Sequence, residues 1–186
     1  IERVFFNHYL KGPEIGKPAL PEAYMFDTGN HKWEKFEEWP PKESQWKSFY
    51  FQEKGELSET TPEGNRFTTF ISDPSNPVPY SQDIKLTFTP RKYMADDQRF
   101  AARRPDVLTF TSEVLSEDMT LAGEVLAKLK VATSQTDADW VVKIVDIFPG
   151  DQPNHAYVLD GVDMGNYHLM VRSEVIRGRY LSLIHI

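Results

Sequence analysis

The segment DWVVKIVDIFP, residues 139–149, decides the fold class of this chain. Successive side chains of an extended strand point to opposite faces, so the apolar residues of this segment fall on both faces. One face carries Trp140, Val142, Ile144 and Phe148, and the other carries Val141, Val145 and Ile147 and is broken only by Lys143. A strand that is apolar on both faces is predicted to lie in the interior, between two layers of structure.

Further strand patterns lie on both sides of this segment. Residues 120–131 alternate between apolar and charged side chains, which predicts a strand with one face in water, and residues 166–180 predict another long strand. Shorter strands are predicted, between turn-forming residues, at 23–27, 46–52, 67–73, 84–89 and 107–112. No helical segment of crossover length separates these strands, so the pattern predicts an antiparallel, two-sheet β-sandwich rather than a parallel α/β sheet.

The first residues have a different period. IERVFFNHYLKGP, residues 1–13, predicts an amphipathic helix that ends at the Lys-Gly-Pro signal, and residues 11–21 predict a linker. His8 lies on the apolar face of this helix, where a packed or interface histidine is more typical than a catalytic one.

Composition excludes several classes of function. The 186 residues carry a formal net charge of −7 and no basic stripe, which argues against binding to nucleic acid. The absence of cysteine excludes disulfides, thiolate catalysis and iron–sulfur clusters. The sequence contains no apolar run of the length that spans a membrane.

No catalytic motif is present in the sequence. It has no G-x-S-x-G, no phosphate-binding loop, no dinucleotide fingerprint and no H-E-x-x-H. Two acidic pairs have spacings seen in calcium sites, namely Asp137 with Asp139 and Asp160 with Asp163. Isolated pairs of this kind are more typical of solvated turns. We therefore expect no catalytic residue, no metal site and no cofactor within this chain.

Two functions from different classes remain open on these grounds. The aromatic residues Trp33, Phe36 and Trp39 favour a free-standing carbohydrate-binding module, although such groups more often close a core. The helix and linker at the start favour an accessory domain attached to a catalytic one.

Several motifs together resemble one family, and they occur in the family's order. They are FFNHYLKG (5–12), DTGNHKWEKFEEWPP (27–41), YMADDQRFAARRPDVLTFTSEVLSEDMTLAG (93–123), TDADWVVKIVDIFPGD (136–151) and LMVRSEVIRGRY (169–180). They are similar to the C-terminal part of the cocaine-esterase-like serine hydrolases, whose C-terminal domain type is shared by the X-Pro dipeptidyl-peptidases. The run DPSNPVPY (73–80) resembles the α-amino-acid ester hydrolases and glutaryl acylase-like members most.

This resemblance implies a galactose-binding-like jelly roll at residues 22–186, preceded at residues 1–21 by the last helix and linker of an α/β-hydrolase domain. The Ser/His/Asp triad of the family matches no residue of this sequence. We therefore expect a non-catalytic domain whose partner is the hydrolase domain of the same protein, in a periplasmic or secreted rather than a cytoplasmic protein. The end LSLIHI (181–186) departs from the family pattern, so we expect an incomplete jelly roll that forms homo-oligomers through an open sheet edge.

The resemblance also nominates two groups of site residues. Aromatic and apolar residues at the rim of the substrate cleft are expected to be Tyr80, Phe88, Tyr93 and Met94. Structural ion pairs within the D-Q-R…R-P-D signature are expected from Asp97, Arg99, Arg104 and Asp106.

Overall fold

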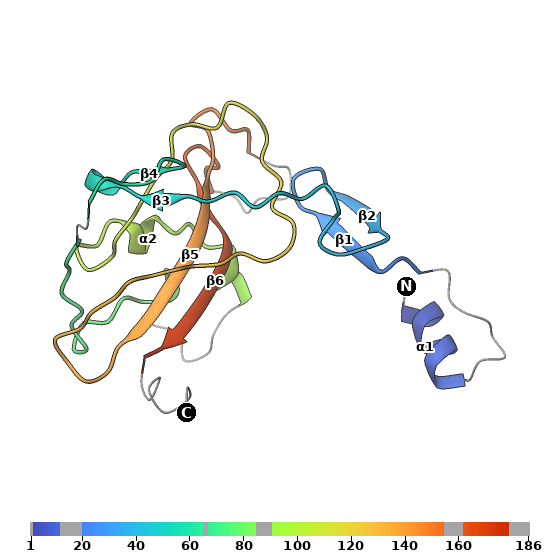
Figure 1. Cartoon of the computed structure of the whole chain (residues 1–186), viewed down its shortest axis with the longest axis horizontal. Coiled ribbons are helices and arrows are strands. Elements are labelled where there is room, and N and C mark those ends of the chain that lie inside the picture. The colour runs from blue at the N-terminus through green and yellow to red at the C-terminus, as the bar shows by residue number, and fades with distance from the viewer. Residues whose placement is uncertain (1, 12–19, 65–66, 85–90, 155–161, 179–186) are drawn as a thin grey trace. The chain divides into compact units, whose positions relative to one another are not determined.

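The computed structural model describes residues 2–11, 20–64, 67–84, 91–154 and 162–178. Antiparallel strand pairs make up most of the regular secondary structure of these residues, and the helices are short, so the prediction of an all-β fold is confirmed (Figure 1). The chain divides into two compact units, residues 1–49 with 114–126, and residues 50–113 with 127–186. No helix in the described ranges is long and apolar enough to cross a membrane.

Helix α1, Glu2–Lys11, confirms the predicted amphipathic helix. Glu2 in its first turn and Lys11 in its last turn both interact favourably with the helix dipole. On its apolar side the rings of Phe5 and Tyr9 lie 4.6 Å apart, one helical turn from each other. Most of the linker predicted after this helix lies outside the described residues.

Strands β1, Ala23–Asp27, and β2, Lys32–Phe36, form an antiparallel hairpin. The turn between them depends on Asp27, whose Oδ1 accepts hydrogen bonds from the backbone N–H groups of Gly29 at 2.8 Å and Asn30 at 3.1 Å. The side-chain amide of Asn30 also donates to Oδ2 of Asp27 at 2.7 Å. This hydrogen bond and the backbone N–H of Asn30 are the chief causes that lower the pKa of Asp27. The short polar residues after the strand therefore reverse the chain, as the sequence predicts.

Strands β3, Tyr50–Phe51, and β4, Leu57–Ser58, form a second, shorter antiparallel pair around the 3-10 turn Glu53–Gly55. Thr111 joins this pair by an isolated bridge to Glu56, with Thr111 N–H donating to the carbonyl of Gly55 at 2.8 Å. The predicted strand at 107–112 is therefore reduced to a single bridging residue.

The predictions of strands at 67–73 and 120–131 were wrong, because no strand is formed there. Alternation of side chains does not provide a hydrogen-bonding neighbour, and these segments have no ladder partner among the described residues. In the second segment Gly123 also interrupts the extended backbone with φ at +102°. Only Ile84 of the strand predicted at 84–89 lies within the described residues, and it is not in a strand.

The longest pairing is the antiparallel hairpin of β5, Asp139–Ile147, and β6, His168–Arg177 (Figure 1). Its register shifts between Ile144 and Val145, which marks a β-bulge. The segment that contains the 3-10 turn Arg91–Met94 and helix α2, Arg99–Ala102, is hydrogen-bonded to this hairpin. The most buried residues of the described chain include Ala101 and Met164, from this segment and from the approach to β6.

Candidate functional site

A cavity of about 400 Å³ lies against the loop formed by residues 73–84. Asp73 shapes the loop, because its Oδ1 accepts from the N–H of Ser75 at 2.8 Å and its carbonyl accepts from the N–H of Asn76 at 3.0 Å. Prolines at 74, 77 and 79 restrict φ along the rest of the loop. The lining residues are Ser75, Asn76, Pro77, Pro79, Tyr80, Ser81, Asp83, Ile84 and Arg104.

Arg104 reaches this cavity from the turn after α2. Its Nε and Nη2 donate to the two carboxylate oxygens of Asp106 at 2.8 and 2.7 Å, and Nη2 also donates to the carbonyl of Asn76 at 3.0 Å. The bidentate hydrogen bonds from Arg104 lower the pKa of Asp106 and keep the pair charged. Because Asp106 neutralises the guanidinium, this wall of the cavity does not present an unbalanced positive charge.

Two of the four residues expected at the cleft rim are in contact. The rings of Tyr80 and Tyr93 lie 5.6 Å apart in an edge-to-face arrangement, and Tyr80 is half-exposed beside the cavity. Met94 is also half-exposed, whereas Phe88 lies outside the described residues. The tyrosine pair therefore forms an aromatic surface next to the cavity.

A set of polar residues next to the loop is centred on the buried Gln98, and we call it the Gln98 cluster. Its members are Asp96, Gln98, Lys143 and His168. Gln98 is only 3% exposed. Its Nε2 donates to the carbonyl of Asp96 at 2.7 Å, and its Oε1 accepts from Nζ of Lys143 at 2.7 Å. Its backbone N–H donates to the carbonyl of His168 at 3.0 Å. One glutamine thus joins the α2 segment to both strands of the long hairpin.

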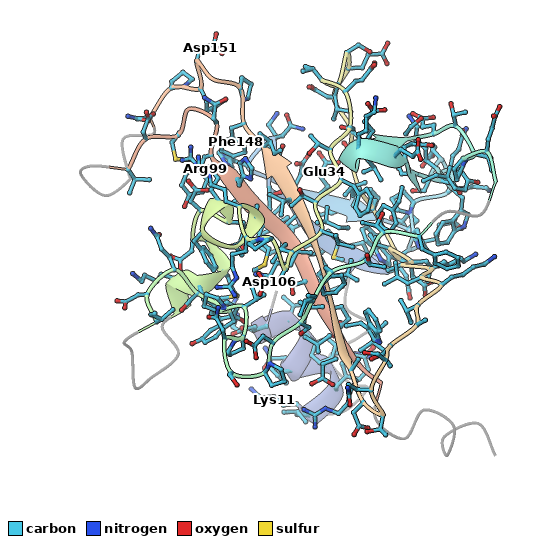
Figure 2. The ribbon with its side chains drawn as sticks, turned by 90° about the vertical axis from the view of Figure 1, so that its left-hand side faces the viewer. Lys11, Glu34, Arg99, Asp106, Phe148 and Asp151 are labelled. Carbon is cyan, nitrogen blue, oxygen red and sulfur yellow. The ribbon has the colours of Figure 1, made fainter. Side chains whose placement is uncertain are left out.

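Asp97 adds a charged contact at the edge of this cluster. Its carboxylate forms an ion pair with Arg99, the first residue of α2 (labelled in Figure 2), and accepts from the backbone N–H of His168 at 3.4 Å. Burial alone would raise the pKa of Asp97, but hydrogen bonds from Arg99 outweigh it and lower that pKa. Burial lowers the pKa of His168, and Asp97 opposes this effect.

The aromatic residues proposed for carbohydrate binding do not form one surface. Trp33 contacts Tyr24 and Phe26 across the β1–β2 hairpin, at 5.1 and 5.4 Å, with ring planes tilted by 43° and 58°. Phe36 and Trp39 form a separate edge-to-face pair at 5.3 Å. Trp33 therefore packs within its hairpin, and Phe36 packs with Trp39.

The acidic pairs considered for calcium have other partners. Asp139 contacts Arg177 at 3.3 Å, and Asp163 accepts from the N–H of Gly165 at 3.0 Å. Asp160 lies outside the described residues, and those residues contain no group of three or more His, Asp or Glu side chains arranged to hold a metal ion.

Sequence reasoning missed several residues of the site. Asn76, Ser81 and Asp83 line the cavity, and Lys143 completes the Gln98 cluster. Ser81 is 2% exposed and its hydroxyl donates to the carbonyl of Asp83 at 3.0 Å, so this serine has a structural hydrogen bond.

Comparison with known proteins gives consistent matches. A cocaine esterase of Rhodococcus sp. is 30% identical over an alignment of 158 residues, and the match covers 80% of this chain and 27% of that protein. A putative serine esterase of Mycobacterium bovis is 21% identical over 84% of this chain and 24% of its own length. The crystal structure of an aminopeptidase from a marine sediment Thaumarchaeota archaeon matches with a TM-score of 0.80 and 33% identity, over 97% of this chain and 29% of that one.

The chain therefore spans only about a quarter of the length of these proteins, namely 24% to 29%. The model of one family, the C-terminal non-catalytic domain of X-Pro dipeptidyl-peptidases, matches residues 16–177, which is most of the sequence. This result confirms the resemblance drawn from the motifs and the β-sandwich class that it implies. The chain belongs to the family of X-Pro dipeptidyl-peptidase C-terminal non-catalytic domains.

Proposed function

We propose that this domain braces the catalytic domain of a serine hydrolase and borders its substrate cleft. The substrates that we propose for the whole protein are α-amino-acid esters, acyl amides or X-Pro peptides. Two esterases and an aminopeptidase among the similar proteins support substrates with ester or amide bonds.

One observation carries the bracing role, namely the many large apolar side chains that are exposed among the described residues of each compact unit. Ala101 and Met164 are the buried hydrophobic residues of these ranges, whereas Leu10 of α1 is 76% exposed and Val141 of β5 is 57% exposed. Apolar surface of this extent marks sites of protein contact. We propose that residues 1–21 pack with the hydrolase domain and that residues 22–186 form the bracing domain.

The loop 73–84 is our candidate for the part that borders the cleft. Its proline-restricted backbone and the Tyr80–Tyr93 pair provide a preformed wall with apolar and hydrogen-bonding groups, as small-molecule sites require. We propose that Tyr80 and Tyr93, with Met94 and Phe88, contact the apolar part of a substrate held by the catalytic domain.

A chimera tests both roles. Residues 16–177 replace the matching C-terminal part of the Rhodococcus cocaine esterase, and this chimera is compared with the same esterase truncated before that part. We expect the chimera to be more resistant to heat than the truncated enzyme, and Tyr80→Ala in the chimera to raise KM for an aromatic ester with little change in kcat. Val114→Ala, at another exposed apolar residue, is the matched control. Equal heat resistance of chimera and truncated enzyme would contradict the bracing role.

We also propose that the isolated chain self-associates through the free edge of β5. Among the described residues β5 pairs with β6 alone, and a nine-residue strand with an open edge invites pairing with another strand. Sedimentation velocity over a range of concentrations should show a dimer or larger species. A folded monomer at high concentration would refute this proposal.

A further inference from the structure

The Gln98 cluster contains two of the three buried polar side chains of the described residues, the third being Ser81 in the cavity loop, and bracing alone does not account for it. Gln98 is 3% exposed and Asp96 is 8% exposed. Burial of polar groups is costly unless they are paired, and no buried side-chain nitrogen or oxygen of the described residues lacks a partner. A fully paired buried group of this kind favours one arrangement of the segments that it joins.

The contacts of the cluster continue into the cavity loop. Oδ2 of Asp96 accepts from the backbone N–H of Gln82 at 3.2 Å. The backbone carbonyl of Asp96 accepts from Gln98 at 2.7 Å, and Gln98 accepts from Lys143 of β5 at 2.7 Å. The loop is thereby connected to the long hairpin through two intermediate residues.

Lys143 is the unusual member of this chain of contacts. It is a charged residue between the apolar residues Val141 and Val145 on one face of β5, and it is half-buried. In the described part of the chain it has no carboxylate partner, and its contacts are Gln98 and the ring of Phe100 at 5.8 Å. Burial lowers its pKa, which shows that the amino group is partly removed from water. An apolar residue would be less costly here, so the hydrogen bond to Gln98 is the feature that lysine adds.

We propose that Gln98 and Lys143 are positioning residues for the cavity: they fix Asp96, and Asp96 fixes the Gln82 end of the loop 73–84. Arg104 holds the other end of the loop through the carbonyl of Asn76. The two ends are thus held by different contacts, and loss of the Gln98–Lys143 contact frees one end alone. This inference goes beyond the proposed function, because it holds whichever substrate or partner meets the cavity.

Hydrogen exchange of backbone amides, measured by NMR on the 186-residue protein, tests the proposal. Lys143→Met and Gln98→Met should each speed exchange of the Gln82 amide by about 10-fold to 100-fold, the range expected for loss of a buried hydrogen bond to a charged group. The amides of Ser75 and Asn76, which Asp73 holds, should change by less than about threefold.

Two further variants separate positioning from a general effect of removing a lysine. Lys130→Met removes an exposed lysine from the same compact unit and should leave the Gln82 amide unchanged. Lys143→Arg retains a cation that can donate to Gln98, so it should restore most of the protection.

A fourth variant covers the case in which Lys143→Met or Gln98→Met unfolds the hairpin. Asp96→Ala leaves Gln98 and Lys143 in place and removes the carboxylate that accepts from Gln82. It should speed exchange at Gln82 while the amides of Val141 to Val145 remain protected. Unchanged exchange at Gln82 in Asp96→Ala, or equal acceleration in Lys130→Met and Lys143→Met, would overturn the proposal.

Discussion

Substitution of Gly55 by alanine tests whether the segment around Thr109 is packed closely on the β3–β4 pair. Gly55 has φ at +78°, and a Cβ atom there would lie 2.9 Å from the backbone carbonyl oxygen of Thr109. That carbonyl cannot move freely, because the neighbouring Thr111 is hydrogen-bonded to Gly55 and to Leu57. A clash with backbone in a packed site costs about 1–3 kcal/mol.

Gly64 provides a matched control for the backbone contribution. Its φ is +76°, and a Cβ atom there would have no neighbour within 4 Å. A positive φ costs an alanine about 1–2 kcal/mol, and the smaller entropy of the unfolded chain returns about 0.4–1 kcal/mol in both variants. We therefore expect Gly64→Ala to lower the free energy of unfolding by about 0.5–1 kcal/mol, with Gly55→Ala lowering it by about 1–3 kcal/mol more.

Urea unfolding followed by circular dichroism measures both values. Equal losses in the two variants would mean that the carbonyl of Thr109 moves away without cost. In that case the single bridge at Thr111 would not fix the 107–112 segment, and this segment would not be packed closely on the β3–β4 pair.

Three other predictions follow from the charged and aromatic contacts. The pKa of Asp97 is lower in the folded than in the unfolded protein. The ionised carboxylate therefore stabilises the fold fully above the ordinary pKa of 3.8, and this stabilisation is lost as pH falls through the folded pKa. Asp97→Asn should flatten the acid side of a plot of unfolding midpoint against pH. Arg104→Lys should lower the thermal midpoint more than Arg172→Lys, because Arg172 and its partner Glu174 are both mostly exposed. Similar shifts would show that the bidentate contact of Arg104 with Asp106 has no special effect on stability. Trp33→Ala should leave glycan-array binding unchanged at background level, and a strong hit lost in this variant would favour the carbohydrate-binding alternative.

The elements that could be predicted from sequence are those whose pairing is local. Helix α1 has its own apolar period and charged ends, and the β1–β2 hairpin has a turn that Asp27 closes through its neighbours. The β5 and β6 strands are long enough that alternation alone indicates them. These features depend on residues close together in the sequence.

The segments 67–73 and 120–131 were predicted as strands but form no ladder among the described residues, because a strand depends on the position of a partner far along the chain. The contacts of the candidate site could likewise be predicted from the sequence only where the partners are close together in the chain. The Asp73 turn and the tendency of Asp97 and Arg99 to pair are visible in the sequence, since the partners are two residues apart. The contact of Arg104 with Asn76 joins residues 28 positions apart, and no local pattern indicates it.

Lys143 shows how a mismatch in a sequence pattern becomes informative once its contact is known. No residue of β5 is fully buried, and the hydrophobic packing of its apolar side chains has no direction that would select one covering segment over another. A single half-buried lysine supplies that direction, because its amino group requires an acceptor at hydrogen-bond distance and Gln98 provides it at 2.7 Å. Replacement of Lys143 by methionine would keep the apolar contacts of the side-chain stem and remove this requirement. Hydrogen exchange at Gln82 measures the difference between those two effects, so it tests whether the lysine that interrupts the strand pattern also positions the cavity loop.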